Sequence, residues 1–328
     1  MNKNAFKIVV NGNDITAKIQ DRVESVTVVD NAGLDSDTVT ILLDDRDQLI
    51  ALPAIDVEME VSLGKYVNNK AVLSWAGIYT IDEVETDDRE GTLSIHGKAA
   101  NMMGSLKAPR SATYDDIELG ELLTVIAHRH GYTAVISPAL ANKKYEHIDQ
   151  RTQSDIDLLV SKASELSAIC KPTGKRLCIL LEDEGKSASG ASLPVLPLDA
   201  KAEGVYITGR ISGRNKYKSV KAYWQRADDS RKDSVSIGGK EPLYEMSGVY
   251  TSHAEAESAM KAKFAQLKRG GLELSCEREL DLSYAAERIV NLFNHRHAGN
   301  YVIKTATHSV GKKVGSTEIV FNLPTGNS

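Results

Sequence analysis

The sequence predicts an α+β chain rich in β-strands, in which two β regions flank an α/β middle region. Short runs that alternate apolar and polar residues fill most of residues 5–100, and turn residues separate them. Two amphipathic helices then follow, and strand runs return after Gly204. We therefore expect three domains, which cover residues 1–104, 105–203 and 204–328.

The N-terminal domain is predicted to be all-β. The segment IDVEMEVSL has the period of two that a half-buried strand requires. Its apolar residues are Ile55, Val57, Met59 and Val61, and its polar residues are Asp56, Glu58, Glu60 and Ser62. Turn sequences such as Asn11-Gly12 lie between such runs, which is typical of a compact antiparallel barrel or sandwich.

The middle region is predicted to contain two capped helices. Ser154 can serve as the N-cap of a helix whose first turn contains Asp155 and Asp157, and carboxylates are favourable at that end. Apolar residues at steps of three and four then form one stripe. They are Ile156, Leu159, Val160, Ala163, Leu166 and Ile169. An earlier helix, with Leu119, Leu122, Leu123 and Ile126, is expected to end at Gly131. The region should close with a flexible loop at about 182–198, because Gly, Ser and Pro occur there without periodicity.

The C-terminal region is predicted to combine strands with one helix. In the run YKSVKAYW, Val220, Ala222 and Trp224 alternate with Lys221 and Tyr223. A capping box of Ser252 and Glu255 then predicts a helix over residues 252–268. Gly270-Gly271 should end that helix.

Composition limits the classes of function. The chain has 328 residues, a formal net charge of −5 and a pI near 6.0, so we expect no stable binding of nucleic acid. The first residues lack the apolar core of a signal peptide, and no stretch is long and apolar enough to span a bilayer. We therefore expect synthesis in the cytoplasm without membrane insertion. The three cysteines lack a CxxC motif, which favours buried reduced thiols.

The motifs of common enzymes are missing. The sequence contains no P-loop, no dinucleotide-binding GxGxxG after a strand and no GxSxG. His128 and His130, like His295 and His297, are two residues apart and lack the HExxH spacing of a zinc site. A pair of catalytic carboxylates cannot be recognised by spacing alone, because such residues meet only in the fold. We expect no catalytic residue, no metal and no cofactor.

Several segments, in order, make the chain resemble the late control protein D family of contractile-tailed bacteriophages. The segment HIDQRTQSDIDLLVSKASELSAI at residues 147–169 is the most informative of them. The others are DSDTVTILLDDRD, WAGIYTIDEVE, GKAANMMGSLKAPRS, ELLTVIAHRHGY, RNKYKSVKAYWQ and SYAAERIV. Each is weakly specific alone, but together they extend over nearly the whole chain.

This resemblance implies a tail baseplate hub. In the family, two small β-barrels per chain and an α/β part form a trimeric ring that joins the sixfold tail tube to the threefold central spike. The implied partners are other copies of the chain, the spike and tube proteins, and tape-measure and baseplate wedge proteins. The implied location is the virion tail. Two alternatives stay open, namely a cell-wall-degrading tail enzyme and the hub part of a type VI secretion-like device.

Interface anchors are expected among aromatic residues, because such residues often dominate binding energy. The candidates are Trp75, Tyr79, Tyr217 and Trp224, and each could instead be barrel core. Tyr217 and Trp224 belong to a basic, aromatic stretch that would also suit single-stranded nucleic acid. Strand alternation divides its side chains between two faces, which favours a packed Trp224 and exposed lysines that would suit an acidic neighbouring subunit.

Overall fold

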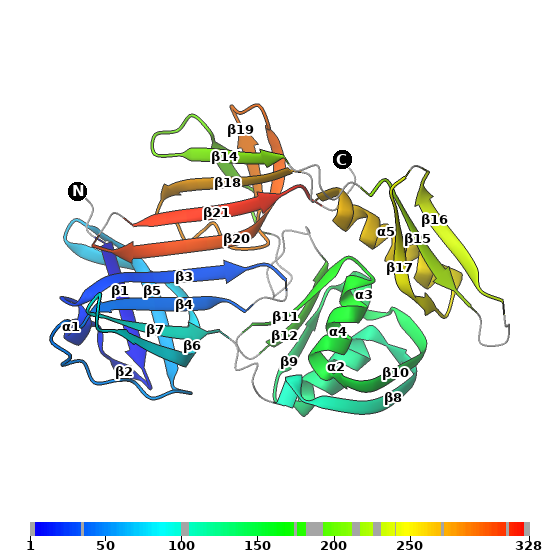
Figure 1. Cartoon of the computed structure of the whole chain (residues 1–328), viewed down its shortest axis with the longest axis horizontal. Helices are drawn as coiled ribbons and strands as arrows, with labels where there is room; N and C mark the ends of the chain where they lie inside the picture. Colours follow the sequence, from blue (N-terminus) through cyan, green and yellow to red (C-terminus); the bar gives the residue numbers. More distant parts are fainter. Residues whose placement is uncertain are drawn as a thin grey trace.

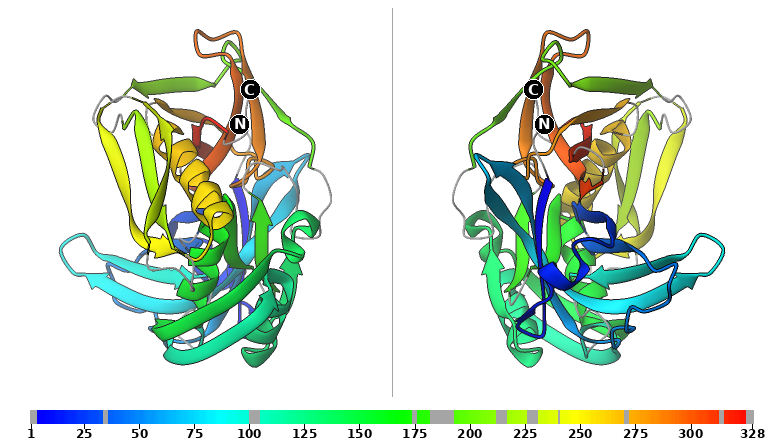
Figure 2. Two further views of the ribbon diagram at one scale, coloured as in Figure 1. Left: turned by 90° about the vertical axis from the view of Figure 1, so that its right-hand side faces the viewer. Right: turned by 90° about the vertical axis from the view of Figure 1, so that its left-hand side faces the viewer.

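The computed structural model describes residues 4–33, 36–99, 105–173, 176–181, 193–211, 217–225, 231–239, 241–269, 272–312 and 315–324. These residues form a β-rich α+β fold, which confirms the predicted class. Figure 1 shows the two β parts on the left, with the middle α/β unit and a further small α/β unit on the right. The two turned views of Figure 2 show the C-terminal β part, in orange and red, above the N-terminal one.

The N-terminal β part contains seven strands and one short helix within the described residues. They are β1 (Asn4–Val10), β2 (Asn13–Asp14), α1 (Thr16–Ile19), β3 (Val23–Asn31), β4 (Thr38–Asp44), β5 (Glu58–Val67), β6 (Lys70–Asp87) and β7 (Thr92–Lys98). The predicted strand IDVEMEVSL begins later than expected, at Glu58. Ile55 is half-exposed in a loop because Asp56 adopts a positive φ of 64°, which breaks the strand there.

The C-terminal β part comes from two separated stretches of the chain. Its strands are β13 (Leu196–Asp199), β14 (Tyr206–Ile211), β18 (Leu272–Glu279), β19 (Ile289–Phe293), β20 (Gly299–Gly311) and β21 (Ser316–Asn322). The start of β13 corrects the predicted loop at 182–198, because Leu196 and Leu198 pair with β19 and Leu198 is buried. Residues 182–192 lie outside the described part of the chain.

The two β parts share one continuous sheet. Strand β20 pairs antiparallel with β3, and eight strands follow one another in the order β14-β18-β21-β20-β3-β4-β7-β6, after which the same sheet continues through β5, β1 and β2. At the seam between the halves, Ser309 lies opposite Thr27, and their hydroxyl oxygens are 3.1 Å apart. One apolar core packs beneath each half, around Ile41 in the first and around Phe321 in the second. We refer to these eight strands as the strand run.

The middle unit has its own core. Its elements are a 3₁₀ turn (Ser105–Lys107), β8 (Pro109–Glu118), α2 (Leu119–Arg129), β9 (Thr133–Ile136), α3 (Pro138–Ala141), β10 (Lys144–Ser154), α4 (Asp155–Ser164), β11 (Ala168–Thr173) and β12 (Arg176–Leu181). The predicted N-cap is confirmed, because the Ser154 hydroxyl accepts a hydrogen bond from the Asp157 amide at 3.2 Å. Helix α4 is shorter than its apolar stripe implied. Ile169 belongs to β11, because the chain turns at Ser167 with a positive φ of 52°.

A separate small unit interrupts the C-terminal β part between β14 and β18. It consists of β15 (Ser219–Trp224), β16 (Asp233–Gly238), β17 (Leu243–Tyr250) and α5 (His253–Arg269). The predicted alternation in β15 is confirmed, since Val220 and Ala222 are fully buried under α5. The predicted helix is also confirmed, whereas Gly270-Gly271 lie outside the described residues. Contrary to expectation, these strands form a sheet of their own and do not join the large one.

Candidate interaction surfaces

Strand β6 ends the strand run on one side. From Thr80 to Asp87 it pairs with β7, and on its other side β5 pairs only as far as Thr80. Ile81 makes two further backbone hydrogen bonds, with Asp56 and Val57, just before β5 begins. Beyond them, no strand in the described part of the chain pairs with residues 82–87 on that side. Unpaired strand edges are able to accept a strand from another chain.

A loop beside this edge exposes several large apolar side chains. We call Asp45–Val57 the leucine loop. Its side chains Leu49, Leu52 and Ile55 are 76%, 62% and 49% exposed. Ile50 and Val57 hold the loop in place, because both pack against the N-terminal core. The outward side chains therefore occupy a fixed surface and are not part of a loosely attached segment.

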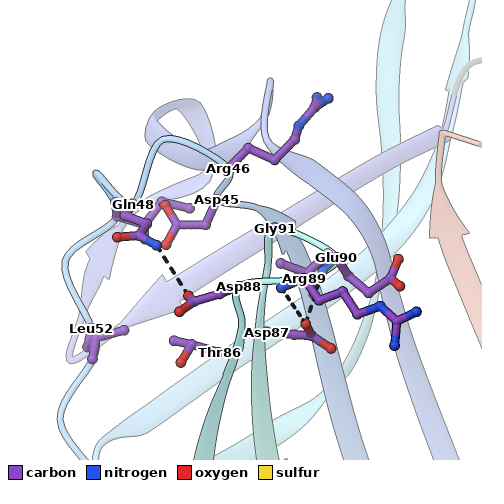
Figure 3. A pocket seen from close by; sticks show the side chains of 12 residues that line it. Asp45, Arg46, Gln48, Leu52, Thr86, Asp87, Asp88, Arg89, Glu90 and Gly91 are labelled. Carbon is purple, nitrogen blue, oxygen red and sulfur yellow. Dashed lines mark hydrogen bonds between the residues drawn. The ribbon is translucent and has the colours of Figure 1, made fainter.

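A pocket of about 340 Å³ lies between the leucine loop and the turn that joins β6 to β7 (Figure 3). Gln48 donates a hydrogen bond to Asp88 across it, at 3.2 Å. Asp87 accepts from the backbone amides of Arg89 and Glu90, at 2.9 and 3.0 Å. These bonds fix the turn against the loop. The carboxylates of Asp87 and Asp88 thus accept hydrogen bonds from neighbouring groups of the same chain. This arrangement is typical of a structural turn and does not indicate a catalytic centre.

Strand β14 ends the strand run on the opposite side. It pairs with β18 on one edge only, so its second edge has no strand partner among the residues that the structure describes. Tyr206 and Ile211, at its two ends, are each 71% exposed. The loop that carries His297 lies beside it, close to Gly209. This edge is thus uncovered and partly apolar.

Three segments carry the most exposed large apolar side chains of the described residues. The five highest exposed fractions belong to Leu49, Tyr206, Ile211, Leu52 and Trp75. Leu49 and Leu52 belong to the leucine loop, Trp75 lies on the part of β6 that pairs with β5, and the other two lie on β14. Large exposed apolar side chains of this kind are candidates for contacts with other proteins.

The face of the strand run that points away from the two cores is polar. On this face the hydroxyls of Thr27 and Ser309 form a hydrogen bond between neighbouring strands. The Thr40 hydroxyl lies 3.1 Å from Nδ1 of His96 on the next strand. Glutamates on this face include Glu83, Glu85, Glu273, Glu277 and Glu318. Lys98, Arg210 and Lys304 are its basic residues in the strands described. The face therefore carries more acidic than basic groups.

A buried lysine joins three parts of the chain. Lys171 in β11 donates hydrogen bonds to the Asn31 carbonyl at 2.6 Å and to the Asp37 carboxylate at 2.9 Å. Its ammonium also lies 3.6 Å from Asp30, which accepts a bond from the Ala286 amide at 2.8 Å. Burial, together with the charge of Asp37, raises the pKa of Asp30 to about 6. Burial opposes the charge of Lys171, but the two aspartates keep its pKa above the ordinary value. The cluster ties the middle unit to both β parts.

Comparisons with known proteins show what the chain resembles. No family model matches the chain. Two curated relatives do match, and both are described as probable baseplate hub proteins. The protein of Escherichia phage 186 is 28% identical over 312 residues, covering 83% of this chain and 79% of the relative. The protein of Escherichia phage P2 is 26% identical over 310 residues, covering 82% and 79%. The chain is similar to these two hub proteins over more than four fifths of its length.

Solved structures show that the fold of this chain also occurs in tail proteins. A tail protein from Neisseria meningitidis has a TM-score of 0.72 at 12% identity, covering 98% of this chain and 96% of that one. A 43 kDa prophage tail protein from Shewanella oneidensis has a TM-score of 0.71 at 10% identity, covering 98% and 99%. An Escherichia coli component of the type VI secretion system reaches 0.53 at 8% identity, covering 92% and 73%. At these identities the likeness concerns the fold alone.

The four predicted anchor residues differ in exposure. Trp75 is 61% exposed and Tyr217 is 37% exposed, so both are accessible. Trp224 is half-buried and packs edge-on against His253. Tyr79 is wrong as an anchor, because only 1% of it is exposed and its hydroxyl donates to the Ala76 carbonyl within the chain. The four residues do not form one surface.

Sequence reasoning missed the leucine loop and the β14 edge. The signal in LIALPAI was its density of apolar residues without strand alternation around a proline. That pattern is ambiguous, since a buried irregular segment would show it too. On β14, Tyr206 and Ile211 looked like ordinary strand residues. Their exposure follows from the position of β14 at the end of a sheet, which depends on pairing between distant segments.

The histidines and cysteines have structural roles. His130 lies at the C-terminal end of α2, as expected, and its side chain is buried, 2.8 Å from Asp155. Burial opposes the charge of Asp155, but hydrogen bonds from Gln150, His130 and Arg129 hold its pKa below the usual range. The prediction of buried, unpaired thiols is confirmed for Cys170, Cys178 and Cys276. Among the residues described, no three His, Cys, Asp or Glu side chains are placed to hold a metal ion.

The helices were also searched for membrane-spanning character. Within the described ranges, none combines the length and the apolar composition needed to cross a bilayer.

Proposed function

We propose that this protein is a structural hub of a phage tail baseplate, or of a related particle, in which three copies form a ring between the tail tube and the central spike. The family supports the hub role, since the relatives in phages 186 and P2 carry that description. The proposed partners are further copies of the chain, the spike and tube proteins and, beyond them, tape-measure and wedge proteins.

The observation that carries this proposal is the strand run with its two free ends. An edge that joins a different edge of the next copy makes a heterologous interface, and such an interface closes into a ring when the rotation permits. We propose that each half of the strand run belongs to one small barrel, with residues 1–104 forming the first barrel domain and residues 204–328 contributing the second. Residues 105–203 then form the α/β region between them. Three copies would present six similar barrels to a sixfold tube.

The polar face of the strand run suits the lining of a central channel. Its hydroxyl groups are hydrated, and its glutamates repel phosphate, so DNA would pass without being held. Purified protein should leave a DNA fragment unretarded in a gel at low ionic strength. Retardation under those conditions would contradict the proposed lining.

The role proposed here is not enzymatic, because large surfaces and not a pocket would carry it. The alternative of a cell-wall-degrading enzyme predicts clearing of peptidoglycan in zymography. We expect no clearing. The remaining anchor candidates Trp75, Tyr217 and Trp224 belong to this proposal as contacts to other tail proteins.

Measurement of the mass in solution tests the proposal. One chain has a mass of 35.7 kDa, so a trimer has a mass of about 107 kDa, three times that value. Light scattering coupled to size exclusion should find this mass, and electron microscopy should show a ring with a central opening. A protein that stays at 35.7 kDa at high concentration would contradict self-assembly.

A further inference from the structure

We infer that the small unit, made of β15, β16, β17 and α5, is a movable arm, and that protonation of Glu165 controls how firmly this arm rests on the middle unit (Figure 1). Glu165 is the last residue of the turn that ends α4, and its main-chain carbonyl accepts a hydrogen bond from the Ser258 hydroxyl of α5 at 3.2 Å. We call this contact between the middle unit and the small unit the seam. The inference goes beyond the proposed hub role and does not depend on the number of copies in the hub.

The small unit is built so that it can move as one body. It has its own sheet and its own core, in which Val220 and Ala222 pack with Ala256 and Met260. It is inserted between β14 and β18, so both of its connections lead to the C-terminal β part, whereas the seam joins it to the middle unit. Movement between such units is the normal expectation unless their interface is large and hydrophobic.

The seam is not closely packed. A cleft of about 370 Å³ lies in it, between the end of α4 on one side and β17 and α5 on the other. The wall from the small unit is mixed, with Tyr250, Ala259 and Lys263 among its residues. The residues of the middle unit that line the cleft are polar, namely Ser161, Ser164, Glu165 and Ser167. Opening the seam would therefore expose little apolar surface of the middle unit, so it costs little free energy from that side.

Two carboxylates, one from each unit, influence each other across the seam. The Glu165 side chain is 20% exposed, and Lys162 donates hydrogen bonds to its two oxygens at 3.1 and 3.2 Å. Glu255 lies in the first turn of α5 and accepts a hydrogen bond from the Thr251 hydroxyl at 2.6 Å. Burial raises the pKa of Glu165 above its ordinary value, Lys162 and Lys143 oppose this rise, and the charge of Glu255 adds to it. The closed seam thus disfavours the charge of Glu165.

The neighbouring tyrosines do not titrate in the same range. Burial, together with the two carboxylates, raises the pKa of Tyr145 and raises that of Tyr250 to about 12, so both phenols stay neutral. The ammonium groups of Lys143 and Lys162 lie 5.8 and 5.0 Å from the centre of the Tyr145 ring. Lys263 donates a hydrogen bond to Gln266 at 2.8 Å on the far wall of the cleft. These lysines supply the positive charge around the two carboxylates.

The sign of the pH effect follows from the raised pKa of Glu165. In the closed seam Glu165 binds its proton more tightly than it would in water, so protonation favours the closed arrangement. This contribution is fully present below the ordinary value of 4.5 and is lost as pH rises through the raised value. Above that value the two carboxylates repel each other across the seam. The arm should therefore rest firmly on the middle unit in mild acid and move away from it in neutral and basic solution.

Spin labels on the two units measure this movement directly. Glu121→Cys on α2 and Ser236→Cys on β16 place the labels at exposed positions away from the seam, and the three native thiols are buried. The distance between the labels is measured by double electron–electron resonance in the full chain. We expect one narrow distribution at pH 4.5 and an added population at longer distances at pH 8. Circular dichroism should be the same at both pH values, which shows that the units stay folded.

Two glutamine variants assign the effect. Glu165→Gln is neutral at every pH, so it should keep the narrow distribution at pH 8. Glu257→Gln is the matched control, because this exposed carboxylate of α5 pairs with Lys261, and it should keep the response of the wild-type protein. Asp30 also titrates in this range, but it lies at the junction with the β parts and is unchanged in both variants.

Three results would overturn the inference. They are a wild-type distribution that does not change with pH, a Glu165→Gln protein that still opens at pH 8, and a Glu257→Gln protein that no longer opens. The last result would assign the response to the overall charge of α5. None of these results bears on the mass of the hub in solution, so the inference and the proposed function can fail separately.

Discussion

Removal of the Lys171 ammonium should destabilise the protein strongly. In Lys171→Met, the carboxylates of Asp30 and Asp37 lose the cation that lies 3.6 and 2.9 Å from them. The Lys171 side chain is only 15% exposed, and the two carboxylates are 27% and 21% exposed. Removing one member of a buried ion pair leaves uncompensated charge and costs about 3–5 kcal/mol. We therefore expect a loss of about that size at pH 8.

The pH dependence of this loss follows from Asp30. Its folded pKa of about 6 lies above the ordinary value of 3.8, so its ionisation weakens the fold as pH rises through this range. The contribution is most favourable below about pH 4 and least favourable above about pH 6. Without Lys171 the ionised form becomes still less favourable, so the loss caused by Lys171→Met should be smaller at pH 5 than at pH 8.

Urea unfolding followed by circular dichroism measures this effect. Lys304→Met, at an exposed position of β20, is the matched control and should cost less than about 0.5 kcal/mol. Adding Asp30→Asn and Asp37→Asn to Lys171→Met should restore part of the lost stability, because no buried charge is then unpaired. A Lys171→Met protein as stable as its control, or a loss that grows at low pH, would refute the reasoning.

Three further predictions concern local structure. Ser154→Ala should lower the free energy of unfolding in urea by about 1 kcal/mol, because it removes the hydroxyl that accepts a hydrogen bond from the Asp157 amide. An unchanged midpoint of unfolding would argue against this N-cap. Gly64→Ala should lower the free energy of unfolding by more than about 1 kcal/mol, because the added Cβ would lie 1.9 Å from the Val72 carbonyl oxygen. Gly239→Ala is the control, since the space around Gly239 is open and its Cβ would meet no clash. The thiols should resist alkylation at pH 8 until the protein unfolds, because burial raises the pKa of Cys170 to about 12 and that of Cys178 to about 11. Rapid labelling of native protein would contradict their burial.

Local patterns predicted the local structure well. The N-cap at Ser154 and the helix after Ser252 were correct because capping depends on residues within one helical turn. The alternation in β15 also identified its buried face, because a period of two is a property of the strand itself. The β-rich class followed from the number of such runs.

Long-range pairing could not be predicted in the same way. The seam of β20 with β3 joins Ser309 to Thr27, and nothing in either segment specifies the other. The separate sheet of β15, β16 and β17 was missed for the same reason. Lys171 looked like one of many lysines, because its burial depends on Asp30, Asp37 and Ala286 from distant segments. The interaction surfaces depend on which strands end the sheet, so they too required the fold.

Electron cryo-microscopy of the assembled hub tests the central claim most directly. The account predicts three copies around one channel, with the strand runs forming its wall. A map in which the strand runs lie apart from the channel wall would contradict it.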